Sequence, residues 1–252
     1  MSEYSNKEAD TDDEHMCLNT RNEKEQEDTS HNSLENITSL QVTEPPPPPF
    51  DPIKRMKEGF NYFKVNEFNK NPSYYRKLAE KPEPKFLIFA CSDSRVCPAT
   101  ILNLRPGEAF MTLNIANMVP AFNQLRYCEV GAVIRYVVLT YKVEAIVVIG
   151  HTRCGGIERL MSIPSGQTKP RDFVDDWVTI GQPAKAKVLA KNPKATGEEL
   201  RTLVEKESVM NSLGNLLSYP YVKAGVTSKK LKLIGGYYDF VRGNFDILGS
   251  KS

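Results

Sequence analysis

From about residue 86 onward, short unbroken apolar runs alternate with segments of helical periodicity. Phe86–Ala90 and Ala145–Ile149 are each five consecutive apolar residues, which is typical of strands buried on both faces of a parallel sheet. Further strands are predicted at 109–113, 231–234 and 236–241, and helices at a short segment near Pro98 and at 127–141, 172–190 and 197–218. This alternation predicts an α/β fold with a mostly parallel β-sheet flanked by helices.

A different pattern precedes the first strand. From Asp51 onward, apolar residues including Phe60, Phe63 and Phe68 recur at helical spacing, and a second helix is predicted at 73–80. An amphipathic segment of this kind needs a surface to cover its apolar side. We therefore expect a projecting N-terminal helical arm that packs against a second subunit.

The first 50 residues do not resemble the rest of the chain. Only 11 of them are apolar, and residues 1–44 hold 12 acidic against 3 basic side chains, a net charge of −9. Five consecutive prolines follow at 45–49 and favour a stiff polyproline helix. We expect an acidic disordered tail over 1–50, ending in polyproline, and a folded domain over 51–252.

The charge and the apolar content of the chain bear on whether it binds nucleic acid or spans a membrane. The folded domain must carry +11 to give the whole chain its net charge of +2, but its basic residues are scattered and form no recognition motif. No apolar run reaches the ~20 residues of a membrane helix. We expect neither a nucleic-acid partner nor a membrane span.

The N-terminal sequence and the number of cysteines indicate the cellular compartment of the protein. The acidic start of the chain does not fit a secretory signal or a transit peptide. The chain has five cysteines, an odd number at irregular spacing, which favours a reducing compartment over a disulfide framework. We expect a cytoplasmic protein whose thiols are free to bind metal.

Reactive residues follow two of the predicted strands. Cys91 directly follows the first apolar run, and His151 and Cys154 follow Ala145–Ile149. Ligands gather at the carboxyl ends of parallel strands, and two thiolates with one imidazole favour zinc with a fourth position open, as in catalytic sites. The alternative is two ordinary buried thiols and a loop histidine. His151 is the one histidine outside the tail, so a His₃ site is excluded.

Charged and small residues surround these three. Asp93 could accept the hydrogen of a zinc-bound hydroxide, and Arg95 could hold Asp93 in place and away from the metal. The alternative for this pair is a solvated ion pair of little energetic weight. Gly155 and Gly156 permit close approach of a ligand to the backbone and, at the start of a helix, would present N–H groups to an anion.

The motifs together resemble the β-class carbonic anhydrases, and the plant type most closely. The resemblance runs from about residue 53 to 248 in the same order as in that family. It is carried by ACSDSRVCP (90–98), PGEAF (106–110), NIAN (114–117), VVIGHTRCGGI (147–157), SLGNLLSYP (212–220) and GGYYDFV (235–241).

The resemblance implies an enzyme that interconverts carbon dioxide and bicarbonate with one zinc ion per subunit. It assigns Cys91, His151 and Cys154 as zinc ligands and Asp93 with Arg95 as the catalytic pair. It also assigns the substrate pocket, with walls at Phe110, Ile115 and Tyr136 beside Gly155. It further implies a homodimer with exchanged N-terminal arms, in which each pocket is completed by the partner, or a higher homo-oligomer such as an octamer.

Two positions depart from the plant pattern. Pro82 stands where plant members usually have a glutamine that hydrogen-bonds the substrate, and Leu113 stands where they usually have an arginine. These departures support one alternative, a zinc-binding scaffold of the same fold with weak or no turnover. A second alternative is a hydrolase of carbon disulfide or carbonyl sulfide on the same scaffold, which would use the same zinc chemistry and differ in access to the pocket. The leading hypothesis is an active carbonic anhydrase.

Overall fold

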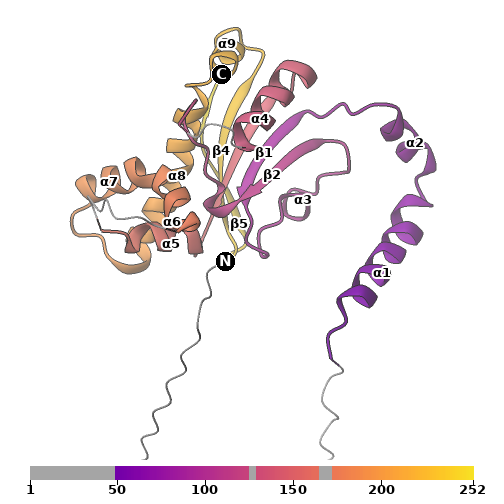
Figure 1. Cartoon of the computed structure of the whole chain (residues 1–252), viewed down its shortest axis with the longest axis horizontal. Coiled ribbons are helices and arrows are strands. Elements are labelled where there is room, and N and C mark those ends of the chain that lie inside the picture. Colours follow the sequence, from indigo (N-terminus) through magenta and orange to yellow (C-terminus); the bar gives the residue numbers. More distant parts are fainter. Residues whose placement is uncertain (1–48, 125–128, 165–171) are drawn as a thin grey trace, which may run out of the picture. The chain divides into compact units, whose positions relative to one another are not determined.

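The computed structural model describes residues 49–124, 129–164 and 172–252 (Figure 1). The chain divides into two units, residues 1–53 and 54–252, and the second contains the whole sheet. The predicted tail lies outside the described residues except for Pro49 and Phe50, both of which are exposed. No helix in the described part of the chain combines the length and the apolar character needed to cross a bilayer.

The sheet has five strands in the described residues, in the order β2-β1-β3-β4-β5. The pairings of β1 with β2, β1 with β3 and β3 with β4 are parallel, and that of β4 with β5 is antiparallel. The strands are β1 (Phe86–Cys91), β2 (Ala109–Asn114), β3 (Ala145–His151), β4 (Lys232–Asp239) and β5 (Asn244–Lys251). The mostly parallel sheet is confirmed, and the two C-terminal strand signals prove to be one strand, β4.

The helices follow the predicted segments with three differences. The predicted helix 172–190 is broken by a 3₁₀ turn because Pro183 starts a new helix after it, and α9 begins at another proline beyond the predicted end at 218. The last turn of the predicted helix 127–141 is a π-helix. The helical elements are α1 (Pro52–Phe63), η1 (Lys64–Phe68), α2 (Pro72–Glu80), α3 (Pro98–Ile101), η2 (Ile115–Asn117), α4 (Glu129–Tyr136), η3 (Val137–Tyr141), α5 (Gly155–Ser162), α6 (Phe173–Val178), η4 (Thr179–Gly181), α7 (Gln182–Lys191), α8 (Gly197–Leu216) and α9 (Pro220–Thr227).

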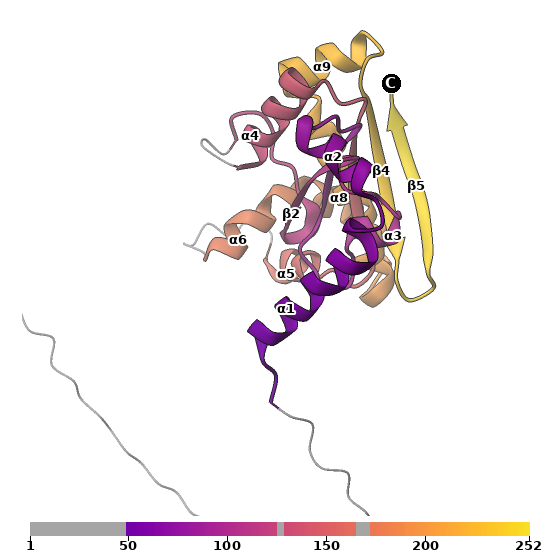
Figure 2. The same cartoon turned by 90° about the vertical axis from the view of Figure 1, so that its right-hand side faces the viewer.

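The two faces of the sheet bury alternate residues of its strands. One face, including Leu87 and Phe89, packs against apolar side chains of α4, α8 and α9. The other face, including Ile88 and Ala90, packs against Leu102 and neighbouring side chains beside the short α3. Figure 2 shows β4 and β5 as the long pair at one edge. Because β1 and β3 are covered on both faces, their sequences read as unbroken apolar runs.

The N-terminal arm is helical, as predicted. No side chain of α1 is buried among the described residues, and Met56 and Phe60 are about two-thirds exposed, at 66% and 65%. The helix α2 is anchored to the turn before β2, where the Tyr74 hydroxyl donates to the Pro106 carbonyl at 2.6 Å and Arg105 lies over the Tyr74 ring. The apolar side of α1 therefore remains open in a single chain.

Candidate metal centre

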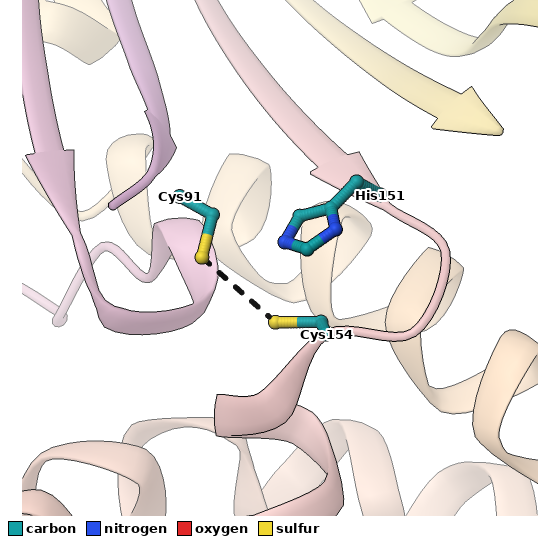
Figure 3. Close-up of side chains that lie close together, drawn as sticks. All are labelled: Cys91, His151 and Cys154. Atoms are coloured by element: carbon teal, nitrogen blue, oxygen red, sulfur yellow. Dashed lines mark hydrogen bonds between the residues drawn. The ribbon is translucent and has the colours of Figure 1, made fainter. Parts of the chain in front are cut away.

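Three side chains that could bind a metal meet at the carboxyl ends of adjacent strands. Cys91 is the last residue of β1, His151 is the last residue of β3, and Cys154 caps the start of α5. Their ligand atoms lie within 4.8 Å of one another, and all three residues are buried. Figure 3 shows the two sulfurs facing each other with the imidazole beside them. The predicted clustering of these residues is confirmed.

The orientation of His151 leaves one ring nitrogen available. Its Nδ1 lies 2.8 Å from the Thr152 carbonyl, and this contact fixes Nδ1 as the protonated nitrogen. Its Nε2 is buried and has no hydrogen-bond partner among the described residues. A buried imidazole nitrogen without a partner is unfavourable unless a cation binds it. His151 therefore has the geometry of a candidate metal ligand.

The two thiols have the spacing that a tetrahedral zinc requires. Their sulfurs are 4.0 Å apart, and two zinc–sulfur bonds at tetrahedral angles place the sulfurs about 3.8 Å apart. The hydrogen bond from Cys154 lowers the pKa of Cys91 to about 4, against the effect of burial. The same bond, with burial, raises the pKa of Cys154. Sulfur ligands at this spacing form a soft site that fits zinc.

The backbone around the site adopts conformations that few residues tolerate. Arg153, immediately before Cys154, has φ +53°, and Ala116 has φ +60° in the turn after β2. A Cβ on Gly156 would lie 2.7 Å from Cγ2 of Ile115 and 2.9 Å from Cβ of Ala116. Gly156 is therefore needed for the turn to approach the start of α5. Left-handed residues of this kind are often found where a functional loop is held in place.

Asp93 and Arg95 form a bidentate ion pair beside Cys91. Asp93 Oδ1 accepts hydrogen bonds from the Arg95 backbone N–H at 3.0 Å and from Nε at 2.9 Å, and Oδ2 accepts one from Nη2 at 2.6 Å. The guanidinium also lies 4.4 Å from the centre of the Phe240 ring. Hydrogen bonding to Arg95 holds the pKa of Asp93 well below its usual range. Asp93 is therefore a fixed carboxylate that only accepts hydrogen bonds.

Comparison with known proteins agrees with this geometry. The profile of the carbonic anhydrase family matches residues 86–245. Beta carbonic anhydrase 3 of Arabidopsis thaliana is 46% identical over 198 residues, which cover 78% of this chain and 77% of that protein.

The chain belongs to the β-carbonic anhydrase family.

Solved structures of β-carbonic anhydrases share the fold. The β-carbonic anhydrase CcaA is 27% identical and has a TM-score of 0.72, covering 77% of this chain and 94% of that one. A tetrameric β-carbonic anhydrase of the ascomycete Sordaria macrospora is 26% identical with a TM-score of 0.70, covering 79% and 98%. The predicted resemblance, fold class and enzyme class are therefore confirmed.

The pocket residues expected for a β-carbonic anhydrase lie in two separate places. The Ile115 side chain packs over Gly156 beside the candidate metal ligands, and it also lines an apolar cavity of about 480 Å³ with Ser92 and Trp177. At Gly155, no heavy atom of the described residues lies within 4 Å of the position a Cβ would take. Ile115 therefore borders a cavity, and the backbone at Gly155 borders open space next to Cys154.

Phe110 and Tyr136 lie elsewhere. Phe110 pairs with Leu87, four residues before Cys91, which places it about 13 Å away along the sheet at ~3.3 Å per residue. Its ring packs 6.4 Å from Tyr136 and 5.1 Å from Tyr141. Within one chain, the structure does not bring these aromatic residues to the candidate metal ligands.

The two departures from the plant pattern are exposed. Pro82 lies in the loop between α2 and β1, at the opposite end of β1 from Cys91. Leu113 lies on the edge strand β2 with 52% of its surface exposed. In this β-carbonic anhydrase Pro82 lies nine residues before Cys91 and outside the sheet, whereas Leu113 pairs in register with Ala90, the residue directly before Cys91.

Two residues that contact the candidate ligands or the Asp93–Arg95 pair were not singled out by sequence reasoning. Glu205 on α8 is buried, and one of its carboxylate oxygens accepts a hydrogen bond from the Cys154 backbone N–H at 3.0 Å. Burial raises the pKa of Glu205. Phe240 lies against both Arg95 and His151, its ring 6.0 Å from the imidazole. The sequence could have indicated that Glu205 is buried, because Glu205 precedes Val209 by four residues and Leu213 by eight and so lies on the apolar face of the helix.

Proposed function

We propose that this protein catalyses the reversible hydration of carbon dioxide to bicarbonate and a proton, with one zinc ion per subunit held by Cys91, His151 and Cys154. The observation that carries the proposal is the buried Nε2 of His151 beside two thiols 4.0 Å apart. Membership of the β-carbonic anhydrase family supports the same reaction. Three protein ligands leave the fourth position of a tetrahedral ion for the reaction.

Zinc at this site would supply a Lewis acid that lowers the pKa of water and so provides the nucleophile at moderate pH. The chain itself must orient that nucleophile. Oδ1 of Asp93 already accepts two hydrogen bonds, whereas Oδ2 accepts one and keeps a lone pair free. Because Asp93 stays ionised beside Arg95, Oδ2 can accept a hydrogen from the attacking water and direct its lone pair toward carbon dioxide.

The pocket around the substrate is composite in our proposal. Ile115 and Gly155 border the metal side of one chain, and Phe110 and Tyr136 of a second chain complete the wall. The separation of about 13 Å between Phe110 and Cys91, worked from the strand register and ~3.3 Å per residue, supports this division. A homodimer, or a higher homo-oligomer built from it, is then the active unit, and the exposed apolar side of α1 supplies a surface for it.

The cellular setting that we propose is the cytoplasm. Cys91, Cys97 and Cys154 are free thiols among the described residues, which suits a reducing compartment. Two of these thiols are needed as metal ligands, so oxidation to a disulfide would abolish the site.

The test is the variant Cys154→Ser, with Cys97→Ser as the matched control. Cys97 is an exposed cysteine on the loop that follows Cys91, outside the ligand cluster. We expect stoichiometric zinc and carbon dioxide hydration in the parent and in Cys97→Ser, and loss of both in Cys154→Ser. Zinc is measured by atomic emission and hydration by stopped-flow with a pH indicator.

Two results would contradict the proposal. Full zinc and full activity in Cys154→Ser would mean that the ligand assignment is wrong. A folded parent that binds zinc but hydrates no carbon dioxide would favour the scaffold alternative, and assays with carbonyl sulfide and carbon disulfide on the same sample would then test the hydrolase alternative.

A further inference from the structure

A buried carboxylate lies directly behind the metal centre. The side chain of Glu205 is 1% exposed. Its Oε1 accepts the hydrogen bond from the Cys154 backbone N–H at 3.0 Å, and its Oε2 accepts one from the Tyr237 hydroxyl at 2.6 Å. Both oxygens are therefore engaged by donors from other elements, one at the start of α5 and one on β4.

One cation near this carboxylate, Arg201, is incompletely paired with it. Arg201 Nε lies 3.8 Å from Glu205 Oε1, beyond hydrogen-bonding distance, and within the described ranges this Nε is buried without a hydrogen-bond partner. Burying an ionisable side chain with such partial compensation is unfavourable for stability. A hydrophobic residue would pack at this point of α8 without that cost, so stability alone does not account for Glu205.

The contacts of Glu205 connect the elements that carry the ligands. The N–H of Cys154 lies at the N-cap of α5, outside the hydrogen bonds of that helix, and Arg153 just before it is left-handed. Tyr237 pairs in register with Gly150, the neighbour of His151. Glu205 thus ties the Cys154 backbone to the strand pair that carries His151.

We propose that Glu205 is a positioning residue for Cys154, and that it holds the thiol toward Cys91 and His151 before the metal binds. This inference rests on the proposed function, since it assumes that the three residues bind zinc. Without the carboxylate, the Cys154 N–H loses its acceptor, and nothing else described in the structure fixes the loop from Arg153 into α5 at that atom. The site would then have to order itself when the metal arrives, which lowers affinity.

The experiment compares Glu205→Ala, Glu205→Gln and Tyr237→Phe with the control Glu207→Gln in the full-length protein. Glu207 lies on the same helix but pairs with Lys187 at the surface. Zinc affinity is measured by competition with a chromophoric chelator. Loss of a residue that orients a ligand weakens metal binding by about 10- to 100-fold, and we expect this for Glu205→Ala. Glutamine keeps a carbonyl oxygen for the Cys154 N–H, so Glu205→Gln should recover most of the affinity.

A second measurement separates positioning from general stability. In the cobalt-substituted protein, the visible bands report ligand geometry, and we expect them to change in Glu205→Ala and Tyr237→Phe but not in Glu207→Gln. If Glu205→Ala melts earlier but keeps the affinity and the cobalt spectrum of the control, Glu205 is structural and the inference is overturned. If Glu205→Ala does not fold, unchanged affinity and spectrum in Tyr237→Phe overturn it equally.

The two proposals fail in different ways. A folded parent that binds no zinc would overturn both the proposed function and this inference. A parent that binds zinc and hydrates carbon dioxide, with all three variants indistinguishable from Glu207→Gln, would overturn only the role of Glu205.

Discussion

Replacing Arg95 by methionine removes the cation that holds Asp93 and leaves the three candidate metal ligands unchanged. Asp93 would lose the two side-chain hydrogen bonds at 2.9 and 2.6 Å and keep the backbone one at 3.0 Å. A hydrogen bond to a charged group contributes about 1.5–3 kcal/mol. The Arg95 side chain is 51% exposed, so solvent screening reduces each bond to about 1–1.5 kcal/mol.

Together the two bonds contribute about 2–3 kcal/mol to the fixed geometry of Asp93, after screening. If this orientation is used fully in the transition state, kcat/KM should fall by about 30- to 160-fold. The pKa of Asp93 should rise toward the ordinary ~3.9 of an aspartate, which still leaves it ionised at neutral pH. The loss should therefore come from orientation and should not be recovered by raising the pH.

The assay is stopped-flow carbon dioxide hydration on zinc-loaded protein, with zinc content and circular dichroism measured on the same samples. The control is Arg242→Met, which removes an exposed arginine paired with Asp239 at 3.7 Å and should leave kcat/KM unchanged. If folded, zinc-loaded Arg95→Met keeps kcat/KM within threefold of the parent, Arg95 does not position Asp93 and the reasoning is refuted.

Three further predictions follow from the chain. Activity should rise with pH through and above neutrality. Arg95 keeps the pKa of Asp93 well below this range, and two thiolate ligands should place the pKa of the nucleophilic water above the ~7 of a His₃ site. A flat stopped-flow profile from mildly acid to alkaline pH would contradict this. Deleting residues 1–44 should leave an active oligomer. Deleting residues 1–70 should also remove the exposed apolar side of α1 and yield monomers in light scattering. An insoluble 45–252 fragment would contradict this prediction. Pro82→Gln should raise kcat/KM by about 10- to 1,000-fold if an oriented side-chain donor to the substrate is missing; a folded, zinc-loaded variant that is no faster would show that another group fills that role.

The fold could be predicted where burial alone dictates the sequence. β1 and β3 are covered on both faces, so their unbroken apolar sequences predict them as strands. β5 is an edge strand whose residues are all exposed or half-buried, so its sequence carries no apolar run and it was not predicted. The break in the helix predicted at 172–190 could have been anticipated from Pro183, because proline favours the first turn of a helix.

The candidate site divides in the same way. Cys91, His151 and Cys154 could be predicted because their chemistry is rare and the carboxyl ends of neighbouring parallel strands meet. The hydrogen bond from the Cys154 backbone N–H to Glu205 could not be predicted. It joins residues 51 positions apart and depends on how α8 lies on the sheet. The motif that contains Phe110 also could not reveal which copy of the chain that residue serves.

The order of the strands has a consequence for how the protein folds. β3 pairs with β1, 59 residues earlier, and with β4, 87 residues later. Such distant parallel pairings form slowly, because the entropic cost of closing the intervening loops comes before the contacts between the strands can form. Cys91 and His151 meet only once β1 and β3 are in register, so a bound metal acts on the last steps of folding. Zinc should then leave the refolding rate unchanged and slow unfolding, which makes the loaded protein long-lived rather than fast to form.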